Sequence, residues 1–230
     1  MRFGIALRTM GRAATGEILR TSALRAESAA LDTLWIPDHI AIPPDDAEGS
    51  GGRYLDPLAT LAWLAAATSR IHLGTAVLIL PYRPALPTAK AIATIQELSG
   101  ERLELGVGVG WMESEFRAVG FDLRARGRIS DEVLTFLHAA FGAPDDVVNS
   151  NQQAFLFRPN PRRPRIWIGG AAPHALARTT RFGDGWLPMT DDPDRLRTPI
   201  AELTARYDDL DGFLRALEPL IEGRDAYRSR

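Results

Sequence analysis

The chain contains no cysteine, which excludes disulfide bonds, thiolate nucleophiles and metal sites built on cysteine. Lysine is almost absent as well, because Lys90 is the only lysine among the 27 cationic residues. Any reaction that needs a lysine side chain would depend on Lys90. We also expect no metal centre. Since the first residues, MRFGIALRT, show no signal-peptide pattern, we expect the protein in a reducing cytoplasm.

The chain also lacks an excess of either charge and a long apolar run. A formal net charge of -2 gives no basic field for nucleic acid or anionic lipid. The longest apolar run, residues 58–67, is too short to span a bilayer, which needs roughly 20 residues. We therefore expect a soluble protein without nucleic-acid or membrane partners. Its 230 residues, 45% of them apolar, suffice for one sizeable core, so we expect a single domain over residues 1–230.

Strand and helix patterns alternate along the chain as far as Met189. Apolar runs predict strands at residues 3–7, 32–40, 71–80, 102–108, 165–170 and 184–189. Helices are predicted at residues 17–31, 58–68, 87–98, 129–141 and 173–182, with an irregular segment at 143–164 and a helical tail at 194–230. This alternation indicates a parallel α/β sheet, either open or closed into a barrel.

The segment GVGVGWMESE, residues 106–115, resembles a nucleotide-binding loop at first sight. A dinucleotide turn needs G-x-G-x-x-G after the first strand, and here Trp111 replaces the third glycine and the motif follows the fourth predicted strand. The pattern therefore disfavours a nicotinamide-binding domain. The alternative is that Gly106, Gly108 and Gly110 leave room for a flat ligand at the carboxyl end of a strand, where parallel barrels build active sites.

Four segments in order carry a resemblance to a known family: LWIPDHI, RIHLGTAVLILPYRP, ELSGERLELGVGVGWMESEF and RPRIWIGGAAPHALARTTRFGDGWLP. Over roughly residues 1–188 the chain is similar to the luciferase-like monooxygenase superfamily, in particular its group dependent on the deazaflavin coenzyme F420. The resemblance implies a TIM-type (β/α)8-like barrel whose carboxyl-end loops hold a flavin or deazaflavin. It also implies an oxidoreductase that transfers a hydride between coenzyme F420 and a small organic substrate.

His39 is the only histidine at the end of a predicted strand, and it follows Asp38. The resemblance places this histidine beside the reactive ring carbon and Asp38 among the cofactor-binding residues. An imidazole there can donate a hydrogen bond or a proton near the hydride-transfer centre. The alternative is a structural histidine that caps the strand together with Asp38. His72, at a strand start, and His138 and His174, on predicted helices, are expected to be structural or surface residues.

Two further backbone features are implied by the resemblance. Family members often carry a non-prolyl cis peptide behind the ring, and we place it at Ala76-Val77. The family holds the cofactor phosphate at the turn that corresponds to Gly169, Gly170, Ala171 and Ala172, where a helix start offers unpaired N–H groups. A tight strand-to-helix connection that needs small residues is the alternative. Arg178 and Arg181 can add charge there or be solvated helix residues.

Glu113 and Glu115 lie two residues apart, so we expect one to point inward and the other to solvent. We assign Glu115 and Trp111 to the substrate pocket, with Trp111 as an apolar wall. In the family's sugar-phosphate dehydrogenases a catalytic Glu occupies the position of Trp111, so that substrate class is in doubt. A carboxylate that only favours the dipole of a helix start is the alternative for Glu115.

The chain departs from the family in length, because no strand is predicted after Met189. We expect a barrel that lacks its last one or two strand-helix units and whose open edge is covered by the C-terminal helices or by a partner chain. We expect a homodimer, as is common in the superfamily. The alternatives to an F420-dependent enzyme are an FMN-dependent monooxygenase of the same superfamily and a degenerate, non-catalytic cofactor-binding protein.

Overall fold

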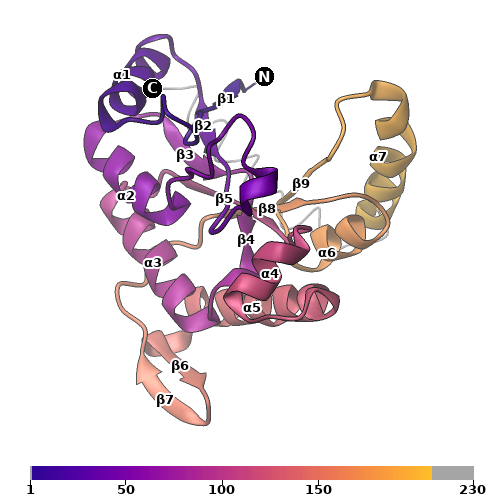
Figure 1. The fold of residues 1–230 in the computed structure, drawn as a ribbon. Helices are drawn as coiled ribbons and strands as arrows, with labels where there is room; N and C mark the ends of the chain where they lie inside the picture. Colours follow the sequence, from indigo (N-terminus) through magenta and orange to yellow (C-terminus); the bar gives the residue numbers. More distant parts are fainter. Residues whose placement is uncertain (1, 209–230) are drawn as a thin grey trace.

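The computed structural model describes residues 2–208, which form a curved α/β half-barrel (Figure 1). The main sheet has seven strands. Six lie side by side and run parallel, in the order β1 (Gly4–Ala6), β2 (Thr33–Ile36), β3 (His72–Thr75), β5 (Leu103–Gly108), β8 (Arg165–Gly169) and β9 (Gly185–Leu187). The seventh, β4 (Leu78–Ile79), pairs with the end of β5.

The helices surround this sheet. They are α1 (Gly16–Ser28), α2 (Pro57–Ala67), α3 (Ala85–Leu98), α4 (Glu113–Val119), α5 (Arg126–Phe141), α6 (His174–Phe182) and α7 (Pro193–Asp208), with 3-10 helices η1 (Pro44–Asp46), η2 (Leu80–Tyr82), η3 (Leu123–Ala125) and η4 (Pro144–Asp146). In Figure 1, α1, α2, α3, α5 and α6 follow one another in an arc around the strands. None of the helices in residues 2–208 is long and apolar enough to cross a membrane.

The six predicted strands are present in the predicted order, and the predicted fold class is confirmed. Edge strands β1 and β9 are not paired with each other, and within residues 2–208 neither has a second neighbour. The sheet is therefore an open part of a barrel. The predicted helical tail is present as α7 up to Asp208, and the remainder of that prediction lies outside the described residues.

Residues alternate between the two faces of the sheet because successive side chains of a strand point in opposite directions. Leu34, Leu73 and Leu105 are at most 1% exposed and belong to the core cluster, which also contains buried residues of α1, α2, α3, α5 and α6. Burial of each such side chain stabilises the fold by about 1.5–3 kcal/mol. The inner face carries Trp35 and Trp167, whose rings meet edge to face with centroids 6.5 Å apart.

Local signals explain where the outer helices begin. Asp56 accepts a hydrogen bond from the N–H of Ala59, and Pro57 occupies the first turn of α2, as its sequence predicts. Thr15 caps α1 in the same way by accepting from the N–H of Ile18. These caps fix the helix starts that follow two of the loops at the carboxyl end of the sheet.

Three local predictions were wrong. The predicted strand at 71–80 is split into β3 and β4 by residues 76–77. The predicted irregular segment contains a hairpin, β6 (Val147–Ser150) and β7 (Gln153–Leu156), whose two-residue turn has φ of 49° at Asn151 and 65° at Gln152. Helix α4 was not predicted, because Met112 at its N-cap has no oxygen that could accept the capping hydrogen bond.

Glu27 connects α1 to the start of β3. Its carboxylate accepts hydrogen bonds from the N–H groups of Ser69, Arg70 and Ile71, at 2.9, 2.8 and 3.0 Å. Burial opposes ionisation, but these N–H groups and the Ser69 hydroxyl outweigh it and lower the pKa of Glu27 to about 2. A carboxyl group whose pKa is lowered on folding stabilises the fold above its unfolded pKa and loses that contribution as the pH falls.

We predict that Glu27→Gln lowers the melting temperature at pH 6 and makes it less sensitive to acid. The loss of charge-assisted hydrogen bonds should cost about 1–2 kcal/mol, or about 2–8 °C. Thermal unfolding of wild type and variant at pH 6 and pH 3 measures this, with the exposed Glu17→Gln on the same helix as the control. If the melting temperature falls equally from pH 6 to pH 3 in wild type and in Glu27→Gln, the Glu27 carboxylate does not cause the acid sensitivity.

Candidate active site

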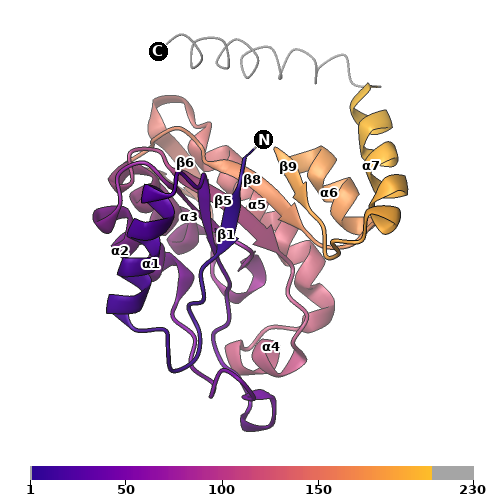
Figure 2. The same ribbon diagram turned by 90° about the horizontal axis from the view of Figure 1, so that it is seen from above.

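His39 lies at the carboxyl end of the sheet, three residues after β2. Its Nδ1 atom is 2.9 Å from Oε2 of Glu115, and the two side chains are 18% and 0% exposed. Figure 2 shows α4, which carries Glu115, at the end of the sheet opposite the N-terminus, together with the loop that follows β2. This end of a parallel barrel is where active sites are built.

The Glu115 carboxylate is fully buried and receives four donors. Oε1 accepts from the backbone N–H groups of Ile40 and Ala41, at 2.7 and 3.0 Å. Oε2 faces Nδ1 of His39 and accepts from the Tyr82 hydroxyl at 3.0 Å. Burial alone would raise the pKa of the Glu115 carboxyl, but the hydrogen bonds from these four groups outweigh burial and lower that pKa.

The predicted orientations of the two acids after β5 are confirmed, since Glu113 is exposed and Glu115 is buried. The carboxylate of Glu115 contacts Nδ1 of His39 and offers no exposed surface to a substrate. Burial and the hydrogen bond to Glu115 also raise the pKa of the Tyr82 phenol, so Tyr82 stays protonated and remains a donor.

Asp38 is buried in an ion pair. Its two carboxylate oxygens face Nη1 and Nη2 of Arg83, at 2.5 and 2.9 Å, and Oδ2 also accepts from the N–H of Ile79 at 2.9 Å. Arg83 reaches Asp56, the cap of α2, at 3.0 Å. The Asp38 side chain is 0% exposed, so it holds the loop after β2 against β4. The burial of this carboxylate disfavours the predicted contact between Asp38 and the cofactor.

The segment at residues 75–77 bends into the sheet and adjoins the loop of His39. The Ala76-Val77 peptide is cis, as the resemblance predicts, and the Ala76 N–H donates to the carbonyl of Ile36 at 2.8 Å. Ala76 is exposed and Val77 is half-buried. The Thr75 hydroxyl donates to the carbonyl of Gly106 at 2.6 Å, which ties the bend to β5.

The glycines of β5 and β8 make room for this bend. A Cβ atom on Gly106 would lie 1.9 Å from the carbonyl oxygen of Thr75, and one on Gly108 would lie 2.5 Å from a methyl carbon of Val77. On Gly169 it would lie 2.7 Å from the other methyl carbon of Val77. The small residues therefore accommodate the bend directly, and the surface above them is formed by Ala76 and Val77.

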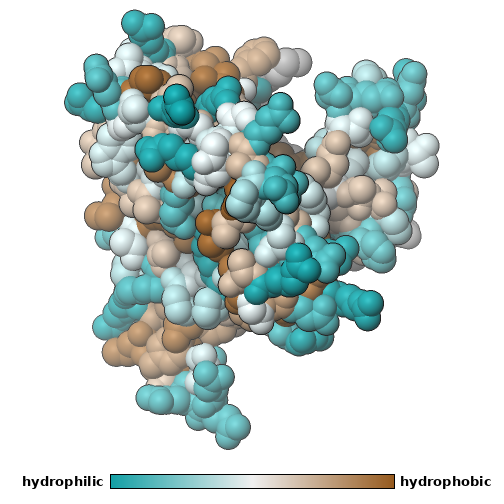
Figure 3. Space-filling model, viewed as in Figure 1, coloured by the Kyte–Doolittle hydropathy of each residue, from teal (hydrophilic) through white to brown (hydrophobic). Residues whose placement is uncertain are grey.

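Two exposed apolar side chains are close in sequence to His39 and Glu115. Ile40 is 47% exposed and Trp111 is 69% exposed. Ile40 donates its N–H to Glu115, and Trp111 lies just before α4. Gly110, before Trp111, has φ of 76° and packs against Phe116, a conformation and a spacing that favour glycine. In Figure 3 the middle of this face, near α4 and β4 of Figure 1, shows a few brown apolar residues among white and teal ones.

The turn at residues 169–172 leads from β8 to α6. Gly170 is already bonded, because its N–H donates to the carbonyl of Leu187 at 3.2 Å and its own carbonyl accepts from the Trp186 indole at 2.8 Å. Ala171 and Ala172 are exposed, and their N–H groups make no hydrogen bond within residues 2–208. Gly169 packs on Val77, so this turn adjoins the bend.

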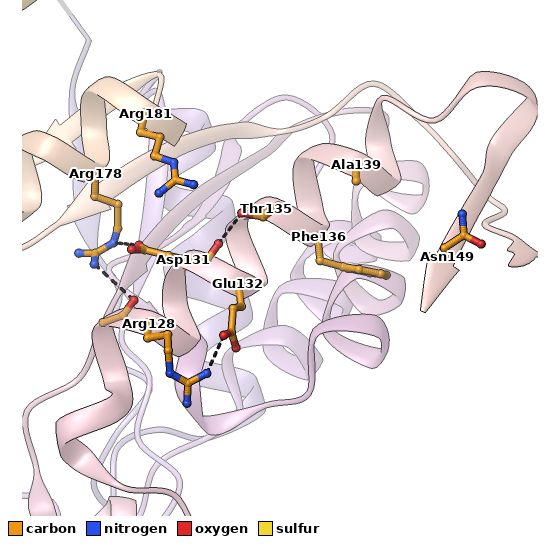
Figure 4. A pocket seen from close by; sticks show the side chains of 10 residues that line it. Arg128, Asp131, Glu132, Thr135, Phe136, Ala139, Asn149, Arg178 and Arg181 are labelled. Carbon is orange, nitrogen blue, oxygen red and sulfur yellow. Dashed lines mark hydrogen bonds and ion pairs between the residues drawn. The ribbon is translucent and has the colours of Figure 1, made fainter. Parts of the chain in front are cut away.

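A groove of about 860 Å3 lies elsewhere, on the outer surface of α5, α6 and β6 (Figure 4). Arg178 is turned toward Asp131, with Nε 2.6 Å from Oδ1, and Arg128 pairs with Glu132 at 2.6 Å. Arg181 lies over the ring of Phe182, 4.6 Å from its centroid. Arg178 therefore serves to join α5 to α6 and is not a free charge beside the turn at residues 169–172.

Three further residues belong to the site and were not predicted from the sequence: Tyr54, Tyr82 and Arg83. Tyr54 packs on the imidazole of His39 with ring centroids 4.7 Å apart. The signal for Tyr82 and Arg83 was the polar pair in LPYRP, directly after an apolar strand. Within residues 2–208 no group of three or more His, Asp or Glu side chains is arranged to hold a metal ion.

The sequence profile described as luciferase-like monooxygenase matches residues 1–216. The chain belongs to the luciferase-like monooxygenase family. An uncharacterized protein of Mycobacterium tuberculosis is 30% identical over 198 residues, 77% of this chain and 67% of that protein. The F420-dependent glucose-6-phosphate dehydrogenase of Kineococcus radiotolerans is 33% identical over 182 residues, 72% of this chain and 50% of that enzyme.

A relative named for a different cofactor is the FMNH(2)-dependent dimethylsulfone monooxygenase of Pseudomonas fluorescens, 27% identical over 150 residues, 62% of this chain and 41% of that enzyme. Among solved structures, the monooxygenase RslO1 from Streptomyces bottropensis superposes with a TM-score of 0.70 at 24% identity. That match covers 91% of this chain and 65% of RslO1, so this luciferase-like chain spans about two thirds of that protein.

We predict that Gly106→Ala destabilises this luciferase-like fold by about 1–3 kcal/mol, because the added methyl group overlaps the carbonyl of Thr75. Denaturant unfolding measures the change. Gly16→Ala is the matched control, since its methyl group would lie 3.8 Å from Trp63, an ordinary contact. Equal stability of Gly106→Ala and wild type would show that the bend at residues 75–77 does not require this glycine.

Proposed function

We propose that this protein is an oxidoreductase that transfers a hydride between coenzyme F420 and a small organic substrate, with His39 beside the reactive ring carbon. The observation that carries the proposal is the pair of His39 and Glu115 at the carboxyl end of the sheet, next to the bend at residues 75–77. When bound, the deazaflavin supplies the carbon that gives or takes the hydride. The protein supplies orientation and a group that can hold a proton.

The residues at this end of the sheet fit a flat ring system. Ala76 and Val77 present a small apolar surface, backed by Gly108 and Gly169, on which a planar ligand can lie. His39 is partly exposed, and its Nε2 atom has no hydrogen-bond partner in the described part of the chain. A ring bound on this surface would lie near Nε2 of His39, a nitrogen that can exchange a proton.

The turn after β8 fits the anionic tail of such a cofactor. The N–H groups of Ala171 and Ala172 are exposed and have no partner within residues 2–208, and no large side chain covers them. They precede α6, whose positive end favours an anion. Gly170 offers no free N–H to an anion, because its N–H already donates to the carbonyl of Leu187.

An apolar substrate suits the surroundings of His39 better than a sugar phosphate. Ile40, next to His39 in the chain, and Trp111, four residues before Glu115, are both exposed. In the sugar-phosphate dehydrogenases that the chain resembles, a catalytic Glu occupies the position of Trp111. We therefore propose a small organic molecule with little charge, and we do not carry over the substrate of the Kineococcus relative.

A second candidate is an FMN-dependent monooxygenase, which the similarity to the dimethylsulfone enzyme supports. The two candidates share the ring surface and the phosphate turn and differ in the cofactor. A third candidate is a non-catalytic cofactor-binding protein, which would bind a cofactor without turnover. A homodimer also stays a proposal, with the exposed Ile18 of α1 and Trp63 of α2 as candidate contacts.

We predict that the protein binds coenzyme F420 with a dissociation constant in the micromolar range or below. Titration with coenzyme F420 and, separately, with FMN, followed by quenching of the cofactor's fluorescence, measures both affinities. Tighter binding of FMN would favour the monooxygenase. Binding of neither at micromolar concentration would overturn the enzyme proposal. Arg128→Ala is the control that should leave both affinities unchanged, because Arg128 is an exposed residue of α5 paired with Glu132.

We predict that His39→Ala leaves the fold and cofactor affinity nearly unchanged and lowers turnover by about 10²–10⁴-fold, the usual contribution of a positioned proton donor or acceptor. Turnover is followed by the absorbance of the deazaflavin with a panel of short-chain alcohols and aldehydes. His72→Ala is the control, because His72 begins β3 at the other end of the sheet. Unchanged turnover in His39→Ala would remove His39 from the reaction.

A further inference from the structure

The contacts of Glu115 determine which nitrogen of His39 carries a proton. An ionised carboxylate only accepts hydrogen bonds. Burial works against ionisation, but the hydrogen bonds from His39, Ala41, Ile40 and Tyr82 keep the pKa of Glu115 low. Since Oε2 lies 2.9 Å from Nδ1, that nitrogen is the donor and bears a hydrogen. In a neutral imidazole the other nitrogen, Nε2, is then the acceptor.

The rest of the carboxylate is fixed by groups that can only donate to it. The N–H groups of Ile40 and Ala41 hold Oε1 at 2.7 and 3.0 Å. The Tyr82 hydroxyl donates to Oε2 at 3.0 Å. Tyr54 packs on the His39 ring, with the two ring centroids 4.7 Å apart. The ring therefore has a supported orientation as well as a supported tautomer.

We propose that Glu115 is a positioning residue that holds neutral His39 as its Nδ1–H tautomer and thereby makes Nε2 the atom that accepts and returns a proton. The tautomer follows from the contacts of Glu115 alone. Its part in catalysis rests on the proposed function, in which Nε2 exchanges a proton with the substrate. When Nε2 takes up a proton, Nδ1 keeps its hydrogen and its hydrogen bond to Glu115.

The variant Glu115→Gln separates this role from packing, because glutamine has nearly the same shape. Two backbone N–H groups face Oε1, so the amide oxygen of the glutamine should take that position. The amide nitrogen then faces Nδ1 of His39 and donates to it. This arrangement requires Nδ1 without a hydrogen, and His39 should switch to the Nε2–H tautomer.

The test is nuclear magnetic resonance of the apo protein labelled with 13C and 15N at histidine, at about pH 9, above the ordinary imidazole pKa of about 6.5. The chain has four histidines, so the spectrum is simple, and His39→Gln assigns the signal. The ring 13Cδ2 and 15N shifts report the tautomer. We expect Nδ1–H for wild type and for Glu113→Gln, the exposed acid two residues earlier, and Nε2–H for Glu115→Gln.

A wild-type His39 in the Nε2–H form would overturn the proposal, and so would a Glu115→Gln protein that keeps the Nδ1–H form. If Glu115→Gln does not fold, the wild-type tautomer still decides, together with Tyr82→Phe, which removes one donor to Oε2 and should leave Nδ1–H in place. If neither wild type nor Tyr82→Phe shows a slowly exchanging Nδ1–H proton, the contact between His39 and Glu115 is contradicted. These results need no cofactor, so they stand apart from a failure of the proposed function, which the cofactor titrations would show.

Discussion

The buried carboxylate of Glu115 joins three segments that follow different strands of the sheet. It binds the backbone of Ile40 and Ala41 after β2, the hydroxyl of Tyr82 after β4 and the imidazole of His39, while its own helix, α4, follows β5. A carboxylate without exposed surface is tolerated only when donors satisfy both oxygens, and these four donors do so. The geometry of the loops at the carboxyl end of the sheet depends on this one group, and so does the orientation of His39.

A second constraint, the bend at residues 75–77, sets the composition of the neighbouring strands. Thr75 and Val77 occupy the space in which side chains of Gly106, Gly108 and Gly169 would lie. The glycine-rich motif of β5 therefore has a steric cause that involves no nucleotide. The result is a surface of Ala76 and Val77 next to His39, with the turn of Ala171 and Ala172 adjoining it through Gly169. The family of luciferase-like monooxygenases, to which the chain belongs, includes relatives named for coenzyme F420 and for FMN.

Much of the fold could be predicted from the sequence, because the strands are short apolar runs and helices such as α2 begin at side chains that cap them. The hairpin of β6 and β7 could not, since its turn depends on positive φ at Asn151 and Gln152, and glutamine does not signal that conformation. Helix α4 lacks a capping side chain at Met112, and the two acids of its first turn are a weaker start signal. The position of His39 after a strand identified it as a candidate. Its partner Glu115 is 76 residues away in the chain, and only the closeness of the strand ends in space brings the two together.

The four histidines of the chain provide a direct map of where a cofactor binds. His39 lies at the carboxyl end of the sheet, His72 begins β3 at the amino end, His138 lies on the outer helix α5 and His174 begins α6 beside the turn of Ala171 and Ala172. Their resonance signals can be recorded while coenzyme F420 is added to the protein. We predict that the signals of His39 and His174 shift as the cofactor binds and that those of His72 and His138 stay in place. A shift of His72 or His138 with His39 unchanged would place the cofactor elsewhere and contradict a site at the carboxyl end of the sheet.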